Sequence, residues 1–213
     1  MTTDNQLALL RTILGEPDDA NEARFTATQL LNFLNLGRKW LCEYSRCFQV
    51  KDSQTTQVGV YIYNTPIEVI GFHAVEYNGI PLDPISLRHW RDQVGDDDTI
   101  QGIPFIYKYF AKQIQLFYAP QEAKTLMYEG WGYAIDLVSG GDDVDLNDYQ
   151  NRGAIFYAGF LAKGSDKRNE SFEYQSAMDI AENLRKQHRP KGPRYIRDNQ
   201  NRISINGRLY YGS

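Results

Sequence analysis

Residues 67–82 read IEVIGFHAVEYNGIPL, and this stretch decides the fold class. β-branched and aromatic residues fill Ile67 to Tyr77, which favours an extended strand. Asn78-Gly79 follows, and these two residues tolerate the positive φ angles that a tight hairpin turn requires. The stretch therefore predicts a β-hairpin in the middle of the chain.

Strand signals continue on both sides of this hairpin. Upstream, apolar residues alternate from Val58 to Ile62. Downstream, three segments have strand composition: Phe105–Tyr109, Gln113–Tyr118 and Thr125–Tyr133. Between the hairpin and these three segments, the pattern predicts a short helix over Leu87–Val94 and a polar loop over Asp96–Gly102. Pro104 and Pro120 fall at strand edges, where no ladder donor is needed, so an antiparallel arrangement is expected.

Helical periodicity brackets these strands. Apolar residues recur at three- and four-residue steps in four segments: Asn5–Leu14, Thr26–Tyr44, Tyr149–Leu161 and Glu170–Lys186. Thr26 or Thr28 can cap the second helix, and Asp145, Asn147 or Asp148 can cap the third.

Three glycines fall inside these helices. Gly37 is a weak spot in the second helix, since glycine costs about 1 kcal/mol relative to alanine in a helix interior. Gly153 and Gly159 fall in the third helix, where they predict a close approach of neighbouring helices.

The order of elements predicts an α+β chain. We expect an α-helical bundle made of residues 1–47 and 137–189, with an antiparallel β domain inserted as residues 48–136. Pro190, Gly192 and Pro193 end the last helix, so residues 190–213 are expected to form an extended, basic C-terminal arm.

Charge is distributed unevenly around a net of -4. Between Leu184 and Ser213 a single acid, Asp198, accompanies eight basic residues: Arg185, Lys186, Arg189, Lys191, Arg194, Arg197, Arg202 and Arg208. These nine residues carry a net charge of +7, which leaves 15 basic and 26 acidic residues, a net of -11, in residues 1–183. An acidic body therefore carries a basic tail.

The sequence has no signature of a membrane or secreted protein. No apolar run approaches the roughly 18 to 20 residues that span a bilayer, and the first residues lack a signal-peptide pattern. Cys42 and Cys47 are the two cysteines, and a disulfide scaffold is not indicated. We expect reduced thiols and a product that folds in the cytosol.

Catalytic signatures are absent from the sequence. His73, His89 and His188 lie far apart in three different contexts, and no serine-hydrolase, zinc-protease, paired-cysteine or phosphate-loop motif occurs. Asp96 to Asp98 and Asp142, Asp143 and Asp145 could hold a hard cation, but neither run has the spacing of a calcium loop. We expect no enzyme activity, cofactor or metal.

Aromatic residues are abundant, with 15 Tyr and 10 Phe. A ladder of them in the β region could stack bases or sugars, although the acidic body opposes a phosphate backbone and favours core and interface packing. The ladder comprises Tyr61, Tyr63, Phe72, Tyr77, Phe105, Tyr107, Tyr109, Phe117, Tyr118, Tyr128, Trp131 and Tyr133.

The tail mixes arginine with tyrosine, which is the composition of protein-binding hot spots. Such a segment can order on a partner by adding a strand to a sheet edge or by placing aromatic rings in a groove. Nucleic-acid binding is the competing explanation. The candidate partner-binding residues are Arg194, Tyr195, Arg197, Arg208, Tyr210 and Tyr211.

Several segments, taken in order, resemble the head-to-tail adaptor, or connector, proteins of tailed bacteriophages. Leu30 to Glu43 looks like their leading helix, and Tyr77-Asn78-Gly79 with Leu82 is similar to their hairpin. Gly102-Ile103-Pro104 to Tyr107, then Ile114 to Pro120, looks like their strand pair, although Gln121 stands where a second proline is expected. Tyr128 to Tyr133 and Tyr157-Ala158 fit their last strand and bundle helix.

This resemblance implies a structural virion protein at the head-tail junction, assembled in the host cytoplasm. It implies a homo-oligomeric ring, commonly of twelve copies, that lies below the portal protein, meets a tail or nozzle protein and continues the DNA channel. An acidic wall would let DNA pass without specific binding. Two alternatives stay open: nucleic-acid binding through the basic arm, and carbohydrate binding by the aromatic β region, with Trp131 as the residue to test.

Overall fold

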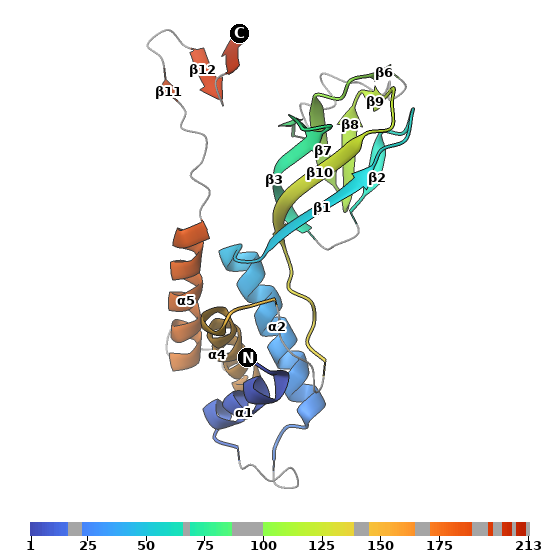
Figure 1. Cartoon of the computed structure of the whole chain (residues 1–213). Coiled ribbons are helices and arrows are strands. Elements are labelled where there is room, and N and C mark those ends of the chain that lie inside the picture. Colours follow the sequence, from blue (N-terminus) through green and yellow to red (C-terminus); the bar gives the residue numbers. More distant parts are fainter. Residues whose placement is uncertain are drawn as a thin grey trace.

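The chain is a mixed α+β structure in which helices and most strands occupy separate parts (Figure 1). The computed structural model describes residues 1–16, 23–65, 69–86, 100–138, 145–164 and 171–188, together with the backbone of three short strands beyond residue 195.

Four helices form within the described residues: α1 (Thr3–Leu14), α2 (Ala27–Ser45), α4 (Asp148–Lys163) and α5 (Phe172–His188). Thr26 caps α2 and Asn147 caps α4, and in both cases a glutamine three residues later accepts a hydrogen bond from the cap's backbone N–H. These caps provide hydrogen-bond partners for backbone N–H groups in the first turn, which have no acceptor within the helix. The four helices predicted from the sequence are confirmed close to their expected bounds.

Helix α4 lies at the centre of the helical part and contacts α1, α2 and α5. Its closest neighbour is α2: a Cβ atom on Gly37 would stand 2.3 Å from the carbonyl oxygen of Ala154. The two backbones therefore touch at a point where only glycine fits. A Cβ on Gly153 or Gly159 would press on side chains of α5 and α1, which confirms the predicted close approach.

The β strands of the described body form two four-stranded sheets and one short pair. The first sheet has the order β1 (Gln49–Thr55), β10 (Thr125–Gly132), β3 (Val69–Tyr77) and β4 (Ile80–Pro81). The second has the order β2 (Ile62–Asn64), β8 (Gln113–Phe117), β7 (Ile106–Phe110) and β5 (Asp83–Pro84). The pair is β6 (Gln101–Gly102) with β9 (Ala119–Pro120).

The predicted hairpin is confirmed, because Asn78 and Gly79 both have positive φ angles between β3 and β4. All longer strands pair in antiparallel fashion, whereas the short pairs β5·β7 and β6·β9 are parallel. The predicted antiparallel arrangement is confirmed for the longer strands, and these two short pairs depart from it.

Two details of the strand prediction are also corrected. The alternating run from Val58 begins as a turn, in which Gly59 N–H bonds to the carbonyl of Pro120, and strand β2 starts only at Ile62. Strand β1 is not among the predicted strands, because its residues QVKDSQT are almost entirely polar. The predicted helix over Leu87–Val94 lies outside the described residues, as does most of the predicted loop that follows it.

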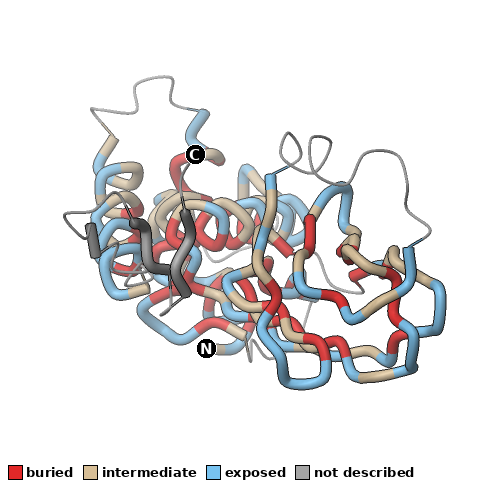
Figure 2. Tube along the Cα trace, turned by 90° about the horizontal axis from the view of Figure 1, so that it is seen from above, coloured by how far each residue is buried: buried red, intermediate tan, exposed pale blue. Residues whose placement is uncertain are grey.

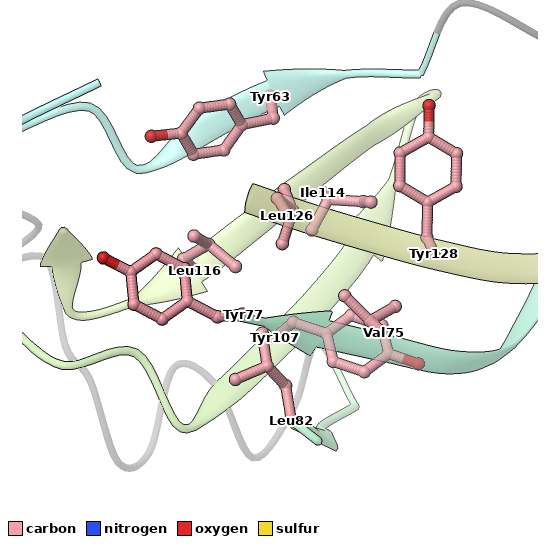
Figure 3. Packing of buried hydrophobic residues seen from close by; sticks show 9 residues of the cluster. All are labelled: Tyr63, Val75, Tyr77, Leu82, Tyr107, Ile114, Leu116, Leu126 and Tyr128. Carbon is pink, nitrogen blue, oxygen red and sulfur yellow. The ribbon is translucent and has the colours of Figure 1, made fainter. Parts of the chain in front are cut away.

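A core rich in tyrosine lies between the two sheets (Figure 3). Its buried members are Tyr63, Val75, Tyr77, Leu82, Tyr107, Ile114, Leu116, Leu126 and Tyr128. Several ring hydroxyls bond to groups at the edge of this core: Tyr77 to the carbonyl of Glu122 at 2.9 Å, and Tyr128 to a carboxylate oxygen of Asp52 at 3.0 Å. The rings are thus buried while their polar ends stay bonded.

A second core joins the helical and β parts. Phe48, Ile70 and Tyr133, at the base of the β part, pack against the same cluster as Leu41 and Leu184 of the helices. Buried residues consequently run through both parts, with exposed residues around them (Figure 2). A third cluster, around Leu10, Leu34 and Ile155, fills the other end of the helical part.

Candidate assembly surfaces

The two described histidines lie on different elements, His73 on β3 and His188 on α5. His73 Nε2 lies 3.6 Å from a carboxylate oxygen of Glu129, and its ring packs against Trp131. His188 ends α5, and His89 lies outside the described residues. No group of three or more potential metal-binding side chains occurs among the residues that the structure describes.

Of the acidic runs, Asp145 is described, whereas Asp96 to Asp98 and Asp142 to Asp143 lie outside the described residues. The Asp145 carboxylate accepts a hydrogen bond from the backbone N–H of Ile135 at 2.7 Å and lies 3.9 Å from the buried guanidinium of Arg38. Asp145 therefore links the backbone at Ile135, beyond the end of β10, to Arg38 of α2.

The aromatic ladder of the β region is largely internal. Tyr63, Tyr77, Tyr107 and Tyr128 are buried, and Trp131 is only 8% exposed. This agrees with the prediction of core packing. Because the ring of Trp131 is covered by Arg46 and His73, it does not offer the open face that a sugar-binding platform requires.

Burial also changes the acidity of these phenols. Desolvation raises the pKa of Tyr107 to about 12, because the charged phenolate is disfavoured in an apolar environment. The pKa of Tyr128 is raised as well, first by burial and then by the neighbouring Asp52 carboxylate. Both groups stay neutral at physiological pH and act as structural hydrogen-bond donors or apolar rings.

The two cysteines are free, buried and close to each other in the joining core. A hydrogen bond from the Cys42 thiol lowers the pKa of Cys47 to about 7, while the same contact and burial raise the pKa of Cys42. Both cysteines are packed in the joining core where α2 meets β1.

The predicted arm contains three strands: β11 (Ile196–Arg197), β12 (Arg202–Ile205) and β13 (Arg208–Tyr211). They pair in the order β11-β12-β13, so that Arg197 and Tyr210 are both Cα partners of Ile203. Of the candidate binding residues, Arg197, Arg208, Tyr210 and Tyr211 lie in this small sheet, and Arg194 and Tyr195 lie outside the described residues. The backbone thus brings four of the six into one element.

A hollow of about 640 Å³ lies at the ends of α2 and α5, where the helices meet the β part. We call it the junction hollow; its lining residues are Trp40, Glu43, Tyr44, Ser45, Arg46, Arg185 and His188. Trp40 stacks on Tyr157 of α4 with ring centroids 4.0 Å apart. The hollow combines aromatic walls with two arginines.

Both arginines of the junction hollow lie over aromatic rings. The guanidinium of Arg185 is 5.5 Å from the ring of Tyr44, and that of Arg46 is 5.1 Å from the ring of Trp131. Such cation–π contacts hold the end of α5 against α2 and the end of α2 against the β part. Sequence reasoning missed this site; the four-residue spacing of Trp40 and Tyr44 could have indicated an aromatic pair on one helix face.

Exposed apolar side chains mark further surfaces on the described residues. On the β part these are Val58, Ile80, Ile100, Ile103, Phe105 and Phe110. Ile80 and Ile103 line a groove of about 280 Å³ beside the β3–β4 turn. On the helical part they are Leu36, Ile135, Val138, Tyr149 and Phe172. Exposed apolar groups of this kind mark contact sites with other proteins when they gather in patches.

Exposed apolar side chains therefore occur on both the helical and the β parts of the described surface. The sequence profile of the family described as SU10 adaptor protein matches residues 1–203. The chain belongs to this family. The match covers both the helical and the β parts and most of the arm. The resemblance to phage head-to-tail adaptors, inferred from the motifs, is therefore confirmed.

Membership of this family makes the chain a structural protein of a phage virion. A comparison with curated proteins gives no match. None of the described helices is long and apolar enough to cross a bilayer.

Proposed function

We propose that the chain forms a ring, of twelve copies, below the portal protein of its phage, where it continues the DNA channel and connects the capsid to a tail or nozzle protein. The observation that carries this proposal is the family match over residues 1–203. The ring has a helical bundle domain (residues 1–47 and 137–189), an inserted β domain (residues 48–136) and a binding arm (residues 190–213) in every copy.

Charge supports a channel role for the body of the protein. Residues 1–183 have a net charge of -11. An acidic wall repels DNA phosphates, so DNA passes without specific binding, whereas a basic wall would retain it.

The arm is the segment that binds the portal or a neighbouring copy. Its strands β11 to β13 total ten residues, which is too small a sheet to be stable alone in water. A partner surface supplies the missing burial. The contacts are made by Arg194, Tyr195, Arg197, Arg208, Tyr210 and Tyr211, because arginine and tyrosine give large, hydrogen-bonding anchors.

The test is the mass of the purified protein, alone and with the portal of its phage, measured by light scattering and checked by negative-stain imaging. A ring of about a dozen copies in either sample supports the proposal. A protein that stays monomeric in both samples contradicts it.

The role of the arm has its own test. Removal of residues 190–213 is expected to leave helicity and thermal stability unchanged, because the helical and β cores are made of residues before that point. The shortened chain is expected to lose portal binding. A full-length double variant, Arg197→Ala with Tyr210→Ala, keeps the arm but removes two of its candidate contacts. It shows whether portal binding depends on these side chains or only on the presence of the arm.

The basic arm also allows binding to nucleic acid, with a net charge of +7 over residues 184–213. Such binding would weaken steeply as salt rises, because it depends on displaced counterions. Portal binding that survives a salt concentration at which DNA binding is lost favours a protein partner.

A further inference from the structure

The two exposed sides of the α2–α4 pair carry different patches. On α2, Leu36, Lys39 and Glu43 are spaced three and four residues apart and so share one side, turned away from Gly37, which meets α4. Ile135 and Val138 lie beside them, since the carbonyl of Ile135 accepts a hydrogen bond from Arg38 and the backbone of Leu137, next to Val138, exchanges hydrogen bonds with Asn35. We call this the front face: Leu36, Lys39, Glu43, Ile135 and Val138.

The other side of the pair is formed by α4 and the start of α5. Tyr149, Arg152 and Phe156 share the side of α4 that points away from Ala154 and hence from α2. Phe172 of α5 meets Phe156 edge to face, with centroids 6.0 Å apart, and is 69% exposed. We call this the back face: Tyr149, Arg152, Phe156 and Phe172.

The front and back faces hold all the exposed large apolar side chains of the described helical part. Leu36 is 52% exposed on the front, and Tyr149 accompanies Phe172 on the back. In a monomer each patch would leave apolar surface exposed to water, and the free-energy cost is roughly proportional to the exposed apolar area. Two apolar patches on opposite sides of one molecule are what a head-to-tail contact requires, because one face of each copy meets a different face of the next.

The charges on the two faces are opposite in sign and lie at the same level along the helices. Glu43 and Arg152 are both exposed, and among the described residues neither has an ion-pair partner. Gln150 of α4 reaches the carbonyl of Cys47, so both charges lie at the end of the bundle near the β part. Leu36 and Phe156 lie further along, where Gly37 meets Ala154.

The position of Glu43 in its own helix is electrostatically unfavourable. It lies in the last turn of α2, where the helix dipole disfavours a carboxylate. The nearby Arg46 and Arg185 lie over aromatic rings instead of pairing with it. A cation supplied from outside the chain fits this position, and Arg152 of another copy has the right charge.

We propose that the front face of one copy packs against the back face of the next, with Glu43 opposite Arg152 and Leu36, Ile135 and Val138 against Phe156 and Phe172. This inference rests on the proposed ring and names the surfaces that close it. For a ring axis running along the helices, rotation keeps each residue at its level, so the matched levels bring the two charges together. The occupant of each face is therefore a second copy of this chain.

The test uses charge reversal in the full-length protein with its portal. Glu43→Arg alone and Arg152→Glu alone each place like charges at every contact, and each is expected to weaken subunit association roughly tenfold. The double variant is expected to assemble like the natural chain. A 1:1 mixture of the two single variants is also expected to assemble, because alternating copies again place opposite charges together.

Leu36→Glu tests the apolar part of the contact. Its matched control is Val58→Glu, an aliphatic side chain of similar exposure, 57%, on the β part. Leu36→Glu is expected to abolish ring formation and Val58→Glu to leave it intact. Circular dichroism of each variant shows whether the monomer has kept its helices.

The outcomes separate this inference from the proposed function. If the natural chain forms no ring, the proposed function falls and the inference falls with it. If the natural chain forms a ring and Leu36→Glu and the charge variants form it equally well, the ring stands and the front and back faces are wrong. A species of two copies overturns the head-to-tail contact.

Discussion

Helices α2 and α4 approach each other so closely that a single Cβ at Gly37 would overlap the backbone, whereas the two β sheets are separated by a layer of tyrosine rings. The helical part places small residues, such as Ala154 and Ala158, where α4 meets its neighbours, and it fills the remaining core with aliphatic side chains such as Leu34. The β part buries its large rings and bonds their hydroxyls at its margins. This difference predicts that the two parts lose folding stability under different perturbations.

Alkaline pH gives the largest expected effect and acts on the β part. The folded state raises the pKa of Tyr107 from 10.0 to about 12, so it holds the phenol proton more tightly than the unfolded state does. Stability is therefore intact below pH 10 and falls as pH rises toward 12, by roughly 2 to 3 kcal/mol for this group. Tyr63 and Tyr128, whose pKa values are also raised, add to the loss.

The measurement is an alkaline titration followed by tyrosinate absorbance and by helical circular dichroism. If the β part unfolds at a lower pH than that at which the helical circular dichroism signal disappears, the β part is the more sensitive of the two to alkaline pH, as expected. Tyr107→Phe, which removes the ionisable group, is expected to shift the transition to higher pH. Simultaneous loss of both signals would mean that the joining core couples the two parts into one unfolding unit.

Gly37→Ala is the corresponding change in the helical part. The new Cβ would stand 2.3 Å from the Ala154 carbonyl oxygen, so α2 and α4 must move apart. We expect a net loss of about 2 kcal/mol, although alanine alone would favour the helix by about 1 kcal/mol. Thermal unfolding checks this, with Gly71→Ala as control, since no atom lies within 4 Å of a Cβ there. Unchanged stability in Gly37→Ala would refute the close contact.

Gly37 also shows the limit of prediction from sequence. Its helix, the cap at Thr26 and the turn at Asn78-Gly79 follow from local residue preferences, and the sequence predicts all three. From local preference alone Gly37 is a weakness; its value lies in contact with a residue more than a hundred positions later. Local sequence patterns do not show which residues distant in the chain come into contact. Glycines in two helices therefore do not reveal which faces of those helices meet.

The same limit applies to strand β1 and to the junction hollow. β1 is an edge strand in which Val50 is the one buried residue, so its polar sequence shows no apolar alternation to reveal it. The hollow brings Tyr44 and Arg185 together from the ends of two helices far apart in sequence. The basic character of the arm and its strand-forming composition are visible in the sequence, but the pairing of its three strands is not.

A smaller effect is expected from Tyr128→Phe, which keeps the ring and removes its hydroxyl. The hydroxyl donates to an Asp52 carboxylate oxygen at 3.0 Å across the β1–β10 pair. Loss of a hydrogen bond to a charged group costs about 1.5 kcal/mol. A double-mutant cycle with Asp52→Ala measures the coupling by chemical denaturation. Additive losses would show that the two groups do not interact, and that ring burial alone holds the sheets.

The smallest effect concerns the connection between the two parts. Arg46 ends α2 with a positive φ of 54° and places its guanidinium over Trp131 of β10. Arg46→Ala removes the cation–π contact while keeping a Cβ in the same backbone conformation, and it is expected to cost about 0.5 to 1 kcal/mol. Arg46→Gly removes the same contact but relieves the backbone, so it is expected to be less harmful than Arg46→Ala. Denaturant unfolding of both variants measures the difference. If Arg46→Ala costs nothing, the shared core of Phe48, Ile70 and Tyr133 is sufficient to hold the helical and β parts together.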